Sequence, residues 1–241
     1  MNIICYASGS RANCYKIDDG ETSCLLEIGI TWKELIRKGA EKPPVFCLLS
    51  HEHRDHSKGW REYVSHGNIL MASAGTLNAL GTEGFVLEPL TSYMFGTFEV
   101  MPFPLVHGDP ESGNGVEAPL GYVIKSTKTN KTLLFATDTV NVFHRFRDVD
   151  IFLIECNHDE ETIDPECDDT HLKWALDSHM SLKTLKQYLS RQMEIGTIEE
   201  VILCHLSSKN AVPEKMAEEV KKLTGAITGV AKTNGGIWRM K

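Results

Sequence analysis

The densest group of metal-competent side chains in this chain comes directly after a short apolar run. Residues 45–49 read Val-Phe-Cys-Leu-Leu, which is typical of a buried strand, and residues 50–56 read Ser-His-Glu-His-Arg-Asp-His. His51 and His53 are two positions apart, so on an extended strand exit they point the same way. A metal site takes two or three ligands from one short segment and closes with ligands from distant segments. The fold must therefore bring other parts of the chain to the end of this strand.

Three more apolar runs are followed by a histidine or an aspartate. His107 comes after one run, Asp138 after a second and His205 after a third. One such residue is ordinary for a loop, but four strand exits that each present a metal-competent side chain indicate a shared site. The seven candidate ligands are His51, His53, Asp55, His56, His107, Asp138 and His205.

Seven donors suit two divalent cations if one carboxylate is shared. Imidazole suits Zn²⁺, Fe²⁺ or Mn²⁺, and carboxylates shift the preference of the site toward hard cations. We therefore expect two ions, either Zn²⁺ or Mn²⁺. Asp138 is the expected shared ligand. Two ions about 3.5–4 Å apart can share a water, lower its pKa toward about 7 and hold a phosphate or carbonyl in line with attack. The expected sets are His51, His53 and His107 for one ion, and Asp55, His56 and His205 for the other.

Charge and composition limit the classes of function. The net charge of −8 argues against a protein that grips nucleic acid by bulk positive charge, although it leaves room for a local basic groove. The seven cysteines are odd in number, contain no Cys-x-x-Cys and lie mostly in apolar runs, so we expect reduced core residues. The N-terminal residues do not resemble a signal peptide, and no apolar run is long enough to span a membrane. We therefore expect a cytoplasmic protein.

Short apolar runs alternate with turns through most of the chain, and no long Gly/Pro/Ser linker divides it. We expect one domain over residues 1–241, with two facing mixed sheets and helices packed outside, an α/β arrangement. Ser181 is a predicted cap for the clearest helix. The predicted strands are 2–6, 13–17, 23–27, 45–49, 68–71, 85–88, 97–101, 119–125, 132–136, 150–154 and 199–204. The predicted helices are 31–38, 57–65, 73–80, 169–176, 181–194 and 212–223.

The His-x-His-x-Asp-His stretch at residues 51–56, with His107, Asp138 and His205, resembles the motifs of the metallo-β-lactamase superfamily. The resemblance implies the αββα sandwich and a dinuclear hydrolase site. The segment between Asp138 and His205 is too short for the β-CASP domain of RNA-processing relatives, so none is expected.

A narrower resemblance is to the YycJ/WalJ-type branch, carried by residues 7–15, 119–122, 155–159 and 205–207. That branch is linked to nuclease activity on DNA ends. The wider phosphodiesterase side of the superfamily includes tRNA 3′-processing enzymes and cyclic-nucleotide phosphodiesterases.

Further polar residues have weaker assignments. His179 lies in a stretch similar to one in tRNA-processing relatives, where a histidine assists at the scissile phosphate. We expect it to be catalytic, as we do Asp55, although a capping or surface histidine would read the same way. Glu27 stands where relatives carry an aspartate, and the resemblance implies that it orients a metal-bound histidine. The residues expected to support ligands or contact substrate are Glu27, Glu155, Asn157, His158, Asp159 and Ser207.

These observations lead to a metal-dependent phosphodiesterase that acts on DNA or RNA ends. A cyclic-nucleotide phosphodiesterase is the alternative, because the acidic balance suits a small nucleotide. A lactone or thioester hydrolase on the same metals is a further alternative, and a metal-binding module without catalysis is another. The expected partner is the phosphodiester substrate, and no association with a membrane is expected. Superfamily relatives often dimerise, so a homodimer is a reasonable expectation.

Overall fold

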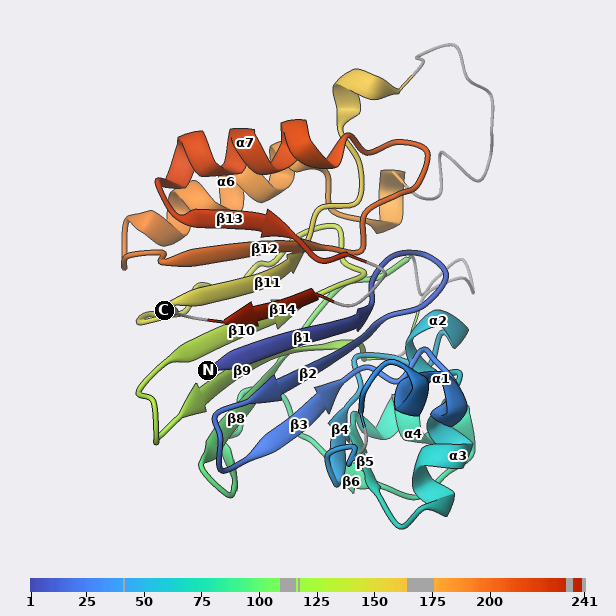
Figure 1. The fold of residues 1–241 in the computed structure, drawn as a ribbon. Coiled ribbons are helices and arrows are strands. Elements are labelled where there is room, and N and C mark those ends of the chain that lie inside the picture. The colour runs from blue at the N-terminus through green and yellow to red at the C-terminus, as the bar shows by residue number, and fades with distance from the viewer. Residues whose placement is uncertain (41, 109–115, 117, 164–175, 233–235, 240–241) are drawn as a thin grey trace.

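The computed structural model describes residues 1–40, 42–108, 116, 118–163, 176–232 and 236–239. Two seven-stranded sheets face each other, and helices cover their outer faces (Figure 1). The predicted α/β sandwich of two mixed sheets with helices outside is confirmed. Helix 169–176, His171 and most of the loop at 108–118 lie largely or wholly outside the described residues.

The first sheet has the strand order β14-β1-β2-β3-β4-β5-β6. The strands from β14 to β3 pair antiparallel, and those from β3 to β6 pair parallel. The β14–β1 pair brings the two ends of the chain onto one sheet (Figure 1). The strands are β1 (Asn2–Ala7), β2 (Cys14–Asp18), β3 (Ser23–Leu26), β4 (Phe46–Leu48), β5 (Ile69–Ala72), β6 (Phe85–Val86) and β14 (Gly236–Arg239).

The second sheet repeats this plan with the order β13-β12-β11-β10-β9-β8-β7. Its β7–β10 half is antiparallel and its β10–β13 half is parallel. The parallel strands β10, β11 and β12 are buried throughout, as strands covered on both faces are. The strands are β7 (Tyr93–Phe95), β8 (Phe98–Pro104), β9 (Leu120–Ser126), β10 (Thr132–Ala136), β11 (Ile151–Glu155), β12 (Glu200–Cys204) and β13 (Ile227–Val230).

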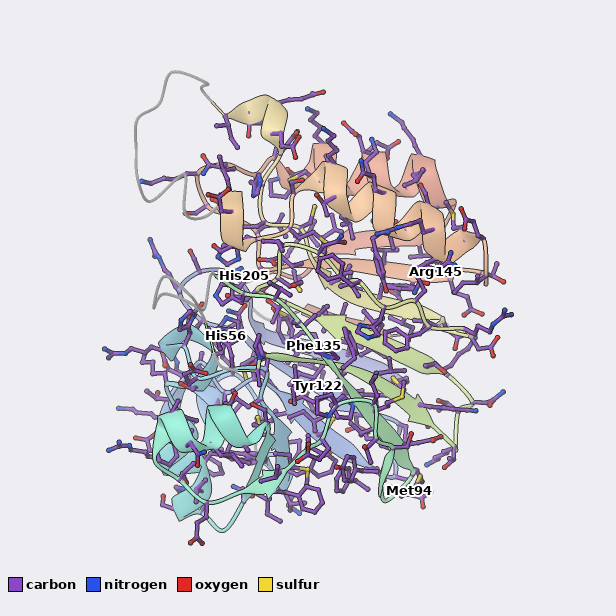
Figure 2. The ribbon with its side chains drawn as sticks, turned by 180° about the vertical axis from the view of Figure 1, so that it is seen from behind. His56, Met94, Tyr122, Phe135, Arg145 and His205 are labelled. Atoms are coloured by element: carbon purple, nitrogen blue, oxygen red, sulfur yellow. The ribbon has the colours of Figure 1, made fainter. Side chains whose placement is uncertain are left out.

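Three apolar clusters hold the layers together. The central cluster fills the space between the sheets, with Tyr15, Tyr122 and Phe135 fully buried (Figure 2). A second cluster joins the outer face of the second sheet to its helices, and a third does the same for the first sheet. Burial of large side chains in three contiguous layers is the main stabilising term for such a sandwich.

The two longest helices cover the second sheet. They are α6 (Leu182–Met193) and α7 (Pro213–Thr224), close to the predicted 181–194 and 212–223. The Ser181 hydroxyl accepts a hydrogen bond from the Thr184 amide at 3.2 Å, so the predicted cap is present. Leu185 and Leu189 face inward because they are four positions apart on one side of the helix.

Short helices cover the first sheet: α1 (Trp32–Arg37), α2 (Arg54–Ser57), α3 (Trp60–Ser65) and α4 (Ala74–Leu80). The helix predicted over 57–65 is present as α3 but starts later, because the helical pattern is interrupted at Gly59, between α2 and α3. The Gly59 amide leaves the helical pattern to bond the Ile28 carbonyl at 2.8 Å. A Cβ at Gly59 would lie 2.0 Å from the Ile30 carbonyl oxygen, so this close approach requires glycine.

Three strands were not anticipated: β7, β13 and β14. All are short edge strands, and β13 contains Gly229. Their strand state depends on pairing with partners far along the chain, which local periodicity does not register. The six cysteines among the described residues are free and buried. No helix in the described ranges is long and apolar enough to cross a membrane.

Candidate metal centre

All seven expected ligands lie at one edge of the sandwich, beyond the C-terminal ends of four strands. The segment after β4 carries the 51–56 cluster, and the segments after β8, β10 and β12 carry His107, Asp138 and His205. Figure 2 shows His56, from the first sheet, and His205, from the second, at this edge. Their ring centroids are 5.4 Å apart. The site therefore lies where the two sheets meet.

One group of donors contains His51, His53, His107 and Asp138. Their ligand atoms all lie within 4.8 Å of one another. The Nε2 atoms of His51 and His107 are 3.8 and 3.6 Å from Asp138 Oδ2, and His53 Nδ1 is 3.2 Å from His107 Nε2. This is the set expected for one ion, with the shared aspartate.

The other group contains Asp55, His56, His205 and Asp138, again within 4.8 Å. Asp55 Oδ2 is 3.2 Å from His56 Nε2 and 3.4 Å from His205 Nε2. Both imidazole nitrogens are also 3.3 Å from Asp138 Oδ1. This is the second expected set.

Asp138 lies between the groups and offers each of them a different oxygen. Its Oδ2 faces His51 and His107, whereas its Oδ1 faces His56 and His205. Thr137 Oγ1 donates to Oδ1 at 2.8 Å and helps to fix the carboxylate. Such a carboxylate can serve two adjacent cations at once.

The far nitrogens of these rings are fixed by other groups. His51 Nδ1 meets Ser50 Oγ at 2.8 Å, and His107 Nδ1 meets the Ser178 carbonyl at 3.1 Å. A partner at one ring nitrogen orients the imidazole and leaves Nε2 as the ligand atom. Nε2 of His51 is buried and has no hydrogen-bond partner within the described part of the chain. An orphaned, fully buried imidazole nitrogen fits a divalent cation.

Two buried glutamates orient the second pair of rings. Glu27 Oε2 is 3.5 Å from His56 Nδ1, and Glu27 also accepts from the Ser50 amide at 3.2 Å. Glu155 Oε1 is 3.1 Å from His205 Nδ1. Glu27 therefore contacts a candidate metal-binding histidine despite its longer side chain.

The two groups have opposite electrostatic balances. Burial lowers the pKa of His51 and of His107, which favours the neutral, ligating form. Burial would also lower the pKa of His205, but Asp138, Asp55 and Glu155 outweigh it and raise that pKa to about 10. In turn His205 and His56 outweigh burial at Asp138 and hold its pKa well below the usual value. The second group is thus a buried ion cluster in which a divalent cation can replace the protons.

Three site residues adopt left-handed backbone conformations. The φ angles are +64° at Glu27, +49° at Asp138 and +51° at His205. Residues other than glycine are uncommon there, and such positions concentrate at functional sites. Each of the three follows a strand, so the sharp turn directs the side chain across the sheet edge.

His179 lies beside the donors but is bound to Glu155. Its Nδ1 is 2.7 Å from Glu155 Oε1, and its ring stacks on His205 with centroids 5.2 Å apart. Asp138, Glu155, His179 and His205 also form a compact group. Glu155 Oε2, however, accepts from the amides of Thr139 and Met180 at 2.9 and 3.3 Å, and Oε1 contacts Nδ1 of both His179 and His205. A cation at Oε1 would displace these two imidazoles, so the two groups described above fit cations better.

The remaining predicted residues differ in whether they contact the donor groups. Asn157 Nδ2 donates to the His205 carbonyl at 3.0 Å, and the Ser207 amide donates to the Asn157 carbonyl at 2.7 Å. His158 is buried and lines a cavity with His179. Asp159 instead pairs with Lys215 at 2.8 Å, outside the donor groups. Its expected support of a ligand is not seen in these contacts.

Asn13 is a contact residue that sequence reasoning missed. Its Nδ2 lies 3.1 Å from His56 Nε2 and 3.4 Å from Asp55 Oδ2, while its amide donates to the Asp55 carbonyl at 2.7 Å. Asn13 begins the predicted strand 13–17 and lies in the 7–15 stretch that carries the narrower resemblance, but neither pattern assigned it a contact with these side chains.

The family model described as a beta-lactamase superfamily domain matches residues 33–205. The chain belongs to this superfamily. Its members are metal-dependent hydrolases, and this chain has the metallo-hydrolase fold with donor groups that suit metal ions. No curated protein sequence matches it.

Solved structures share the fold at low sequence identity. Zn²⁺-bound PqqB from Methylobacterium extorquens is 15% identical, with 100% of both chains covered and a TM-score of 0.75. Unliganded yeast PDE1 is 12% identical, with 99% of both chains covered and a TM-score of 0.73. Human tRNase Z, short form, is 13% identical, with 100% of both chains covered and a TM-score of 0.68.

Proposed function

We propose that this protein is a metal-dependent phosphodiesterase that acts on the ends of DNA or RNA and holds two divalent cations. The observation that carries the proposal is Asp138, whose two oxygens face two different donor groups. When bound, the paired cations would supply an activated water at neutral pH and positive charge against a phosphate.

The chain's own residues would position and protonate the substrate. His179 presents its Nε2 beside the donor groups because Glu155 occupies its Nδ1. A proton held at that nitrogen is available to the leaving oxygen of a cleaved phosphodiester, a contribution of about 10²–10⁴ in rate. Asn13 steadies Asp55 and His56 from the opposite side. The resemblance to the nuclease branch and the shared fold with a tRNase support a nucleic-acid substrate.

A cyclic-nucleotide phosphodiesterase is the second candidate. The net charge of −8 favours a small nucleotide over a polymer, and yeast PDE1 has the same fold. The two functions place different demands on the surface around the site. A polymer contacts several phosphates and its cleavage should fall steeply with salt, whereas cleavage of a small nucleotide should not.

One side-by-side assay tests both. Protein loaded with Mn²⁺ or Zn²⁺ is incubated with end-labelled DNA and RNA and with 3′,5′-cyclic nucleotides, and Asp55→Ala serves as the control. Stepwise release of mononucleotides, absent in the variant, is the expected result. Conversion of cyclic to linear monophosphates with both polymers intact would favour the second candidate. No cleavage of any phosphodiester would contradict both.

A further inference from the structure

A cavity of 640 Å³ adjoins the metal centre but contains none of its donors. Its walls come from Ser8, residues 206–208, the start of α7 and the end of β13. Ser8 Oγ accepts a hydrogen bond from the His205 amide at 3.1 Å, so cavity and metal centre share a wall. Figure 1 shows the β1–β2 loop, in blue, on the same side as the chain that connects β12 to α7. A group bound here would lie next to a phosphate at the metal centre.

The lining suits a nucleoside. Ser207 and Ser208 offer hydroxyls at the edge, and the Ser207 hydroxyl already turns the loop by accepting from the Lys209 and Asn210 amides at 3.3 and 3.2 Å. Mostly apolar walls with a few polar groups are typical of pockets for small organic rings. The apolar lining residues are Leu206, Pro213, Ala217, Val230 and Ala231.

Positive side chains lie on or next to the segments that line this cavity. Lys232 lines it, Arg11 lies on the loop that begins at Ser8, and Lys209 follows Ser208; all three are exposed. None of them forms an ion pair with any residue that the structure describes. Glu214 is the one acidic residue among the described lining residues. The rim therefore carries a net positive charge on a chain that is acidic overall.

A second hollow, next to His179, has the opposite character. It measures 670 Å³, contains His179 and His158, and includes Glu160 and Asp177 in its lining. A phosphate chain is attracted to the first cavity and repelled by the second. This asymmetry would let a strand approach the metal centre from one side only.

We propose that the cavity beside Ser8 is the subsite for the nucleoside next to the scissile phosphate, and that Arg11, Lys209 and Lys232 bind further phosphates of a single-stranded nucleic acid. The inference rests on the proposed function and gives it a substrate class and a direction. Because the acidic hollow does not accept a continuing phosphate chain, cleavage falls at the strand end.

Binding of a fluorescent single-stranded oligonucleotide, as DNA and as RNA, tests the subsite apart from catalysis. Anisotropy is measured with a chelator present, so that nothing is cleaved. Arg11→Glu/Lys209→Glu should weaken binding at least about 10-fold and reduce the salt slope by about 1.4, two single-strand phosphate contacts. Glu214→Lys should tighten binding roughly 3-fold, a gain that misfolding does not produce. The control Lys42→Glu/Lys125→Glu carries the same charge change on exposed lysines outside the cavity lining, and it should bind as the wild type does.

The outcomes separate this subsite from the proposed reaction. Equal binding by all variants, or equal weakening in the control, would overturn the subsite even if the strand is cleaved. Selective weakening and the Glu214→Lys gain would support it even if the cleavage assay fails. In that case the surface binds nucleic acid, and only the proposed reaction is wrong.

Discussion

Two buried aspartates join the two sheets, one at each end of the sandwich. Asp19, in the turn after β2, reaches Thr97 and Ser126 of the second sheet, and Asp138, after β10, reaches the histidines that follow β4. Both have a pKa below the ordinary value although burial alone would raise it. The groups that lower the pKa differ, however. This difference distinguishes the end of the sandwich where Asp19 stabilises the fold from the end that carries the candidate metal centre.

Asp19 is satisfied by neutral donors. Its Oδ1 accepts from the amides of Glu21 and Thr22 at 3.0 and 2.8 Å, and its Oδ2 accepts from the hydroxyls of Thr97 and Ser126 at 2.6 and 2.7 Å. Asp138 instead faces four imidazoles, and among the described residues the buried Nε2 of His51 has no hydrogen-bond partner. A complete set of donors needs no further ligand, whereas the Asp138 cluster suits a cation.

Replacement of Asp55 should have the largest effect, because it removes a donor from the metal end. Asp55→Ala should lose one metal ion per chain and lower the cleavage rate by more than about 10³-fold. Elemental analysis of the loaded variant and single-turnover assays measure the two effects. Retention of two ions per chain by this variant would show that Asp55 is not a ligand.

His179→Ala should lower kcat by about 10²–10⁴ while the metal content stays at the wild-type level. The reason is that His179 contacts the donor rings but is held by Glu155 rather than by a cation. His66→Ala is the matched control, since His66 is exposed and stacks on Trp32. Unchanged turnover in His179→Ala would remove this residue from the mechanism, and loss of metal would make it a ligand.

Replacement of Asp19 should lower the stability of the fold without changing metal binding or turnover. Asp19→Ala leaves two hydroxyls and two amides without the charged group that accepts their hydrogen bonds. It should reduce the free energy of unfolding by about 2–4 kcal/mol. Urea denaturation measures the loss, and the metal content and kcat of the folded variant should match the wild type. If the variant unfolds like the wild type but binds less metal, Asp19 acts on the metal centre and not on stability.

The Asp19 contribution should also depend on pH. Its pKa in the folded protein is about 2, below the ordinary 3.8, because hydroxyl and amide donors outweigh burial. A lowered pKa stabilises the fold above the ordinary value and loses that effect as pH falls toward 2. The difference in unfolding free energy between wild type and Asp19→Ala should therefore shrink steadily from pH 5 to pH 2.5. A constant difference over this range would mean that the charge of Asp19 is not involved.

The sequence predicted the metal end better than the opposite end. The candidate ligands were recognisable because dense, chemically distinctive residues follow buried strands, and strand ends converge in a sandwich. Asp19 carries no such signal, since its partners Thr97 and Ser126 are far away in sequence. Asn13 shows the same limit. Its contacts with Asp55 and His56 join segments far apart in the sequence, which local pattern does not specify.

Fold-level prediction failed in a similar way. The long amphipathic helices α6 and α7 carry their own periodic signal. The short edge strands β7, β13 and β14 do not, and the helix predicted over 57–65 starts later because of a backbone contact between Gly59 and Ile28. Elements defined by long-range pairing were thus the ones missed.

The most direct test of a two-cation centre is a crystal structure of the Zn²⁺-loaded protein with anomalous data at the zinc edge. Two peaks about 3.5–4 Å apart are expected. One should lie among His51, His53 and His107, the other among Asp55, His56 and His205, with Asp138 between them. A single peak, or a peak bound by Glu155 and His179, would contradict the shared role assigned to Asp138.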